Sequence, residues 1–166
     1  MEMPNSLSLA NRLCISAFSV ALIVACSGAS RVSPLHATIV TVEDTVALQQ
    51  GGDGPGFTVT AVVRNNDSRV IQVAVCGTEA QREIDGTWTT VFTPACASMG
   101  LTPIAAGDSL VLPVQISSFR FSSSTGGGAI IPGRYRLVFG LYAADTSSPT
   151  ALSVGQAEPS SPFVVK

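Results

Sequence analysis

Few side chains in this sequence could do catalytic chemistry. A relay of nucleophile, histidine and carboxylate needs an imidazole held in a fixed position, and the chain has a single histidine, His36. The small and polar residues that precede it predict a flexible tether, which would not hold an imidazole. The adjacent carboxylates Glu43 and Asp44 could supply half of a calcium site, or simply a solvated strand end. We therefore expect no catalytic residues and a protein that is not an enzyme.

Metal and cofactor motifs are also missing. The chain has no Cys-x-x-Cys and no His-Glu-x-x-His. Cys96 and Met99 have the spacing of part of a copper loop, but no histidine lies between or after them, so a His₂Cys site cannot form. Ser122–Gly128 is rich in glycine but lacks the lysine of a phosphate-binding loop. We expect no metal, no cofactor, and a surface loop at Ser122–Gly128.

Length and charge narrow the class of protein. The 166 residues suffice for one ordinary domain. Lys and Arg number 9 against 11 Asp and Glu, and only 12% of residues are charged, compared with about 25% in a typical soluble domain. A nucleic-acid binder would need clustered basic residues, so nucleic acid is not an expected partner. The 46% of hydrophobic residues can bury a core, which excludes a disordered chain.

The N-terminus has the pattern of an export signal. Leu13–Ala25 is uncharged and apolar, and Arg12 precedes it. A membrane-spanning helix needs about 20 apolar residues, so this shorter segment fits a signal peptide over 1–25. It ends in Ile-Val-Ala before Cys26, which resembles the lipobox of bacterial lipoproteins. The resemblance implies that Cys26 is acylated, becomes the first mature residue and begins a tether over 26–36.

Two alternatives to lipid attachment stay open. Signal peptidase could cut at Ser27-Gly28-Ala29 and release a secreted protein, or Cys26 could stay in an uncleaved helix. If Cys26 is acylated, membrane lipid is the first partner of the chain. The residue after it is Ser27 rather than Asp, which in a diderm bacterium implies outer-membrane sorting, so we expect the chain in the cell envelope, at the outer membrane or facing the periplasm.

The rest of the chain alternates between apolar and polar residues with a period of two, as strands do. Turn signals such as Pro132-Gly133 separate these segments. Strands at this spacing predict an all-β, antiparallel sandwich over 37–166. We expect seven strands and a short edge piece: 37–48, 56–65, 69–76, 80–84, 87–93, 108–117 and 133–143, then 162–166.

A hairpin brings two cysteines together. Asp85-Gly86 has the composition of a type I′ turn, which pairs Ile84 with Thr87. In that register Cys76 and Cys96 are one step from being opposite each other, and a β-bulge could absorb the step. An exported chain meets oxidising conditions, so we expect a Cys76–Cys96 disulfide, which would stabilise the domain by about 3 kcal/mol. The alternative is two buried free thiols.

Three short motifs carry a resemblance to a known type of domain. Pro132–Leu137 has the form Pro-Gly-x-Tyr-x-Leu, Asp85-Gly86-Thr87-Trp88 the form Asp-Gly-x-Trp, and Ala106–Ser109 the form x-Gly-Asp-Ser. They resemble motifs of bacterial immunoglobulin-like, or fibronectin-III-like, envelope domains. The resemblance implies an immunoglobulin-like β-sandwich in which Tyr135 closes a corner by bonding to nearby backbone. Such a fold hosts many functions.

The remaining pattern indicates binding rather than catalysis. On the strand that contains Tyr135, the opposite face has Arg134, Arg136 and Tyr142, residue types enriched in contact patches. This face is either a binding face or an ordinary solvated one. We expect a non-catalytic, lipid-anchored envelope module that binds another, unidentified envelope protein. The alternative is a secreted or anchored proteinase inhibitor that presents a loop at Ser122–Gly128 or Gly100–Pro103.

Overall fold

The computed structural model describes residues 33–52, 54–94, 100–118, 130–143 and 156–166. The chain divides into two units, Met1–Ser33 and Pro34–Lys166, and almost all the described residues belong to the second. The expected signal peptide, Cys26 and most of the tether therefore lie outside the described residues. Within the described part no helix is long and apolar enough to cross a membrane.

The described residues form strands and no helix, so the expected all-β class is confirmed. The strands are β1 Ala37–Thr41, β2 Thr45–Val46, β3 Gln49–Gly51, β4 Gly54–Asn65, β5 Ile71–Ile84, β6 Thr87–Phe92, β7 Leu101–Ile104, β8 Ser109–Ser117, β9 Gly133–Ala143, β10 Gln156–Pro159 and β11 Phe163–Val165.

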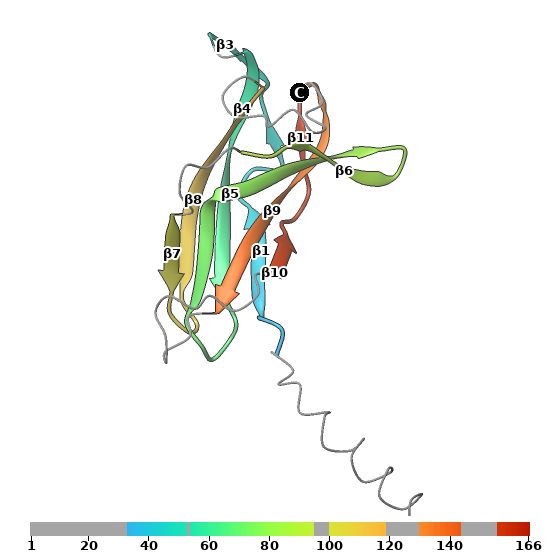
Figure 1. The fold of residues 1–166 in the computed structure, drawn as a ribbon. Helices are drawn as coiled ribbons and strands as arrows, with labels where there is room; N and C mark the ends of the chain where they lie inside the picture. Colours follow the sequence, from blue (N-terminus) through green and yellow to red (C-terminus); the bar gives the residue numbers. More distant parts are fainter. Residues whose placement is uncertain (1–32, 53, 95–99, 119–129, 144–155) are drawn as a thin grey trace, which may run out of the picture. The chain divides into compact units, whose positions relative to one another are not determined.

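The strands build two sheets (Figure 1). In the first, sheet A, β4 is central: β1 and β3 pair with one edge of it and β8 with the other. In the second, sheet B, the order is β2-β11-β9-β5-β6. In addition, β10 pairs with β9, and β7 pairs with β5. Every pairing is antiparallel except that of β2 with β11, which is parallel.

The core lies between the two sheets. Alternate residues of β4 and β9 are buried, as the period-two pattern predicts. The rings of Phe57 from sheet A and Tyr135 from sheet B meet edge to face, with centroids 5.3 Å apart, and Phe163 packs against both. Edge-to-face contacts are the geometry that aromatic quadrupoles favour, so this cluster fixes how the sheets face each other.

The strands differ from the predicted ones in four places, one of which is β3, Gln49–Gly51, a short strand that was not predicted. The expected strands 69–76 and 80–84 are one long strand, β5, whose pairing with β9 is irregular between Ala74 and Glu79. The expected strand 37–48 is interrupted between β1 and β2. β7 and β10 were not predicted, because both are short and each contains a proline, which normally indicates a loop.

The hairpin has the expected turn. Asp85 and Gly86 both have positive φ, 50° and 77°, as a type I′ turn requires, and Ile84 pairs with Thr87. The register shifts further along, where Ala80 pairs with Phe92 although Gln81 pairs with Thr90. β6 thus has one extra residue, which is the kind of bulge expected between the turn and the cysteines.

Polar contacts close two corners of the fold. The Tyr135 hydroxyl donates to the Ile131 carbonyl at 2.6 Å and accepts from the Ile131 N–H at 3.3 Å, so the expected tyrosine corner is confirmed. At the end of β4, the fully buried Asn65 side chain donates to the carbonyls of Arg69, Ile104 and Ala105. Asn65 therefore joins the turn after β4 to the turn after β7.

The folded unit begins before the predicted boundary at 37. Leu35 is buried, its N–H donates to the Gln156 side chain, and its carbonyl accepts from the same side chain. The His36 N–H lies 3.4 Å from the Asp67 carboxylate, and the His36 carbonyl accepts from Asn66. These two residues, which the sequence placed in the tether, belong to the domain.

Candidate functional site

Glu43, one of the acidic pair that could have begun a calcium site, has a structural role. The Glu43 carboxylate accepts the Thr60 N–H at 2.8 Å and the Thr60 hydroxyl at 2.9 Å. These hydrogen bonds to the charged form lower the pKa of Glu43. No cluster of three or more metal-ligating side chains occurs in the described part of the chain. Glu43 thus fastens the segment after β1 to β4.

Arg134 and Arg136 meet on the outer face of sheet B. The guanidinium of Arg136 lies 4.6 Å from the centre of the Trp88 ring, and that of Arg134 lies 5.7 Å from it. Both distances fall within the range of a cation–π interaction. Trp88 comes from β6 and the arginines from β9, with β5 between them. We call these three residues the Trp88 platform.

Polar partners on β5 hold the arginines in place. Arg134 donates to Glu83 at 2.8 Å, and the Arg136 Nε donates to the Gln81 side chain at 2.8 Å. The register explains this arrangement, because Gln81 is directly opposite Arg136 and Glu83 directly opposite Trp88. The Arg134 side chain stays 53% exposed, so it can still meet a partner. Fixed side chains lose little conformational entropy on binding.

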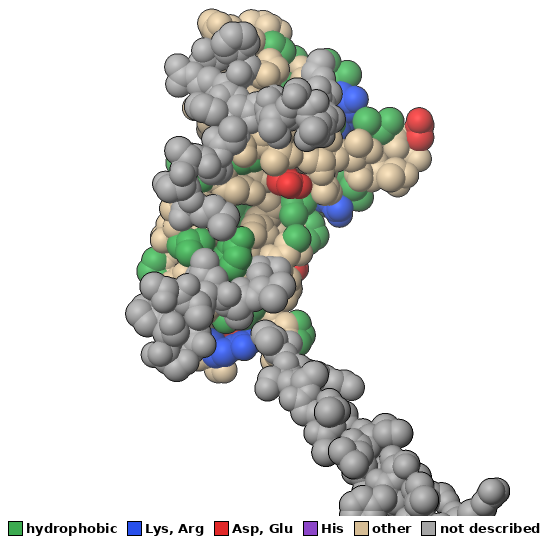
Figure 2. All heavy atoms as spheres, viewed as in Figure 1, with side chains coloured by type: hydrophobic (Ala, Val, Ile, Leu, Met, Phe, Trp, Pro, Cys, Tyr) green, Lys and Arg blue, Asp and Glu red, His purple; other side chains and the backbone are tan. Residues whose placement is uncertain are grey.

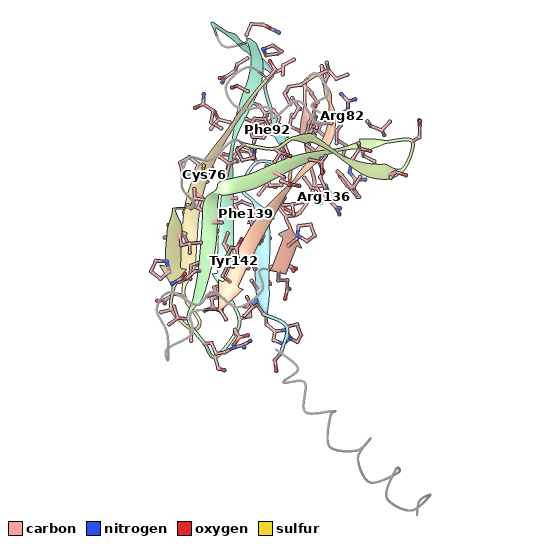
Figure 3. The ribbon with its side chains drawn as sticks, viewed as in Figure 1. Cys76, Arg82, Phe92, Arg136, Phe139 and Tyr142 are labelled. Atoms are coloured by element: carbon pink, nitrogen blue, oxygen red, sulfur yellow. The ribbon has the colours of Figure 1, made fainter. Side chains whose placement is uncertain are left out.

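Tyr142 lies elsewhere on the same strand. A side-chain carbon added to Gly140 would meet the Tyr142 ring at 3.4 Å, so the ring covers this glycine. Figure 3 shows Arg136 and Tyr142 at different points along β9. The structure brings together Arg134 and Arg136, and it separates Tyr142 from both.

Sequence reasoning missed Trp88 as a member of this face. The Asp-Gly-x-Trp motif drew attention only to the turn. The signal was nevertheless there, because a two-residue hairpin fixes which residues of β5 and β6 are opposite each other. Glu83 and Trp88 share one face of the hairpin, and β9 continues that face.

Cys76 is the one cysteine among the described residues. Cys76 is half-buried on β5, but Cys96 and Cys26 lie outside the described residues. Cys76, Thr78 and Phe92 line a cavity of about 230 Å³, with Val114 and Ile116 of β8 on its other side. The Cys76–Cys96 pairing stays a prediction.

Only one of the two loops proposed for a proteinase inhibitor lies among the described residues. Ser122–Gly128 lies outside the described residues. Most of Gly100–Pro103 belongs to β7, whose residues from Leu101 on pair with β5. A segment that is hydrogen-bonded into a sheet is not a loop presented to a protease, so Gly100–Pro103 is not a suitable inhibitory loop.

Comparisons with known proteins place this geometry in no established family. No family model matches the chain, and no curated protein matches it. Among solved structures, the chain is similar to the Pseudomonas fluorescens alkylpurine DNA glycosylase AlkC, at 10% identity and a TM-score of 0.39 over 88% of this chain and 33% of that one. It is also similar to a β-glucosidase from Listeria innocua, at 15% identity and a TM-score of 0.34 over 79% of this chain and 16% of that one.

A third similar structure is a PapD-like domain of human CEP192, at 7% identity and a TM-score of 0.34 over 82% of this chain and 91% of that one. The chain thus spans a third or less of the two enzymes. Likenesses this weak say nothing about what this chain does.

Proposed function

We propose that this chain is a non-catalytic, lipid-anchored module of the cell envelope, of immunoglobulin-like type, that binds another protein through the Trp88 platform. The lipobox-like residues before Cys26 support the anchor. The platform carries the binding part of the proposal. The proposal gives no role to catalysis, a metal or a cofactor.

The strand order supports the immunoglobulin-like assignment. β1, β4 and β8 share one sheet, as the A, B and E strands of such domains do. β11, β9 and β5 share the other in the order of the G, F and C strands, with β6 beyond β5. The tyrosine corner lies at the start of β9, the equivalent of strand F.

The bulge in β6 supports the proposed Cys76–Cys96 disulfide. Beyond the bulge, Ala80 pairs with Phe92, and the same register continued along both strands would place Cys96 opposite Cys76. Directly opposite residues have Cα atoms about 4.5–5.5 Å apart, which is within disulfide reach. The disulfide would tie β5 to the chain that follows β6.

The Trp88 platform supports protein binding because it combines the side chains that dominate protein interfaces. Tryptophan and arginine are the residue types most enriched among energetically dominant contacts. Here two arginines are oriented on one tryptophan before any partner arrives. An exposed guanidinium beside an aromatic ring suits a partner that offers a carboxylate and an apolar side chain close together.

The test is cross-linking of the tagged protein in cells, followed by mass spectrometry. The variant Arg136→Glu removes a cation from the platform, and Arg64→Glu makes the same charge change on an exposed arginine of sheet A. We expect one protein to be recovered with the wild type and with Arg64→Glu, and at least tenfold less of it with Arg136→Glu. Cys26→Ser should also reduce recovery, because the domain leaves the membrane. Equal recovery with Arg136→Glu and Arg64→Glu would refute the platform.

A further inference from the structure

Among the edge strands that the structure describes, β6 is the one in which no described residue blocks the addition of another strand. Proteins usually protect sheet edges with prolines, charges, short strands or covering segments. Here β7, β8 and β10 each contain a proline, and β2 and β3 are short. The outer edge of β1 is covered, because Ser161 bonds to Ile39 and Thr41. β6 reads Thr-Trp-Thr-Thr-Val-Phe, without proline or charge.

The free edge of β6 exposes a defined set of main-chain groups. In a two-residue hairpin the first pair, Ile84 with Thr87, exchanges both hydrogen bonds, and bonded pairs then alternate with unbonded ones. The N–H and C=O groups of Trp88 and Thr90 therefore point away from β5. Neither residue has a main-chain partner on that side among the described residues. Figure 1 shows the turn end of this hairpin projecting beyond the neighbouring strands of sheet B.

We propose that two copies of this chain associate by antiparallel pairing of β6 with β6. A two-fold axis makes the same patch serve both copies. One register uses all the outward groups: Trp88 of each copy is opposite Thr90 of the other, which gives four hydrogen bonds. The two Thr89 residues then face each other on the axis. A register centred on Trp88 would instead place Thr90 opposite the turn residue Gly86. The φ of Gly86 is 77°, which is not the extended conformation that strand pairing needs.

Charge favours a second copy as the occupant. In antiparallel pairing of a strand with itself, the residue on the two-fold axis meets its own copy, so a charge at that position would repel the second copy. β6 has none, and its exposed Thr89 meets only another threonine. The acidic residues of the hairpin, Glu83 and Asp85, lie on β5 and in the turn, away from the new seam.

The test uses opposite charges at the two-fold axis. Two differently tagged full-length copies are expressed together, extracted in mild detergent, and recovered through one tag. We expect wild-type copies to be recovered together and recovery to fall by at least about threefold when both copies are Thr89→Lys, or both Thr89→Glu. A Thr89→Lys copy with a Thr89→Glu copy should restore it. Thr89 is exposed, so these changes leave the core intact.

The matched control is Thr58→Lys, an exposed threonine on β4 of sheet A, which should leave recovery unchanged. Three results would overturn the proposal. The first is the absence of wild-type co-recovery. The second is full co-recovery of two Thr89→Lys copies, which would indicate shared micelles or another interface. The third is failure of a Thr89→Lys copy to pair with a Thr89→Glu copy. None of these outcomes depends on the Trp88 platform having a partner.

Discussion

Removing the Asn65 side chain should strongly destabilise the domain. Its amide nitrogen lies 2.8 Å from the Arg69 carbonyl and 3.0 Å from those of Ile104 and Ala105, and its oxygen accepts the Asp67 N–H at 2.9 Å. Asn65→Ala leaves these groups without their partner in a buried corner. At about 1 kcal/mol for each lost bond, and more where a buried group stays unpaired, the free energy of unfolding should fall by about 3–4 kcal/mol.

The neighbouring residue provides a matched control for that experiment. Asn66 makes its side-chain bond to the Thr38 hydroxyl in an exposed setting, at 2.7 Å. Water can replace this bond, so Asn66→Ala should cost less than about 1 kcal/mol. Urea unfolding followed by circular dichroism measures both values. If Asn65→Ala lowers the free energy of unfolding by no more than Asn66→Ala does, the buried amide does not hold the corner.

Three further predictions concern other bonds of the fold. The Asp67 carboxylate accepts bonds from the Arg69 side chain, which hold its pKa well below the ordinary value. Stability from this group is present above the unfolded pKa of about 4 and is lost as the pH falls below it, so Asp67→Asn should flatten the acid side of a stability–pH curve; an unchanged curve would contradict this. Tyr135→Phe removes the hydroxyl bonded to Ile131 and should lower stability by about 1–3 kcal/mol in urea unfolding, whereas a loss below about 0.5 kcal/mol would show that the corner bond contributes little. Dithiothreitol should lower the melting temperature by several degrees if Cys76 pairs with Cys96; an unchanged melt, with both thiols titratable beforehand, would rule the disulfide out.

The strands that could be predicted from the sequence are those with one buried face. β4, β8 and β9 alternate cleanly because each has the core on one side and solvent on the other. β5 was predicted as two strands because its irregular middle, between Ala74 and Glu79, interrupts the alternation. Its pairing with β9 nevertheless continues before and after that interruption. β7 and β10 could not be predicted, since their pairing depends on distant strands rather than on their own residues.

Only part of the candidate site could be predicted from the sequence, because the rest depends on which strands pair. Arg134 and Arg136 share a face by simple alternation along one strand. Trp88 joins them only because β5 pairs with β6 on one side and with β9 on the other, a fact of topology. Tyr142 has the same parity as the arginines, but parity does not reveal that its ring folds back over Gly140.

The extra residue in β6 links the proposed disulfide, the Trp88 platform and the free edge. Val91 is the inserted residue, and both it and Phe92 are buried, so the alternation of β6 breaks there. On the core side of the break, Ala80 pairs with Phe92, and this is the register on which the proposed Cys76–Cys96 disulfide depends. On the turn side, a bulge bends its strand and increases its twist, and the turn end of the hairpin projects as the arm at the upper right of Figure 2. Trp88, Thr89 and Thr90 lie on this side of the bulge. Deletion of Val91 should therefore alter the proposed disulfide and the edge together, whereas Thr89→Lys, on the turn side of the bulge, should leave the proposed disulfide unchanged.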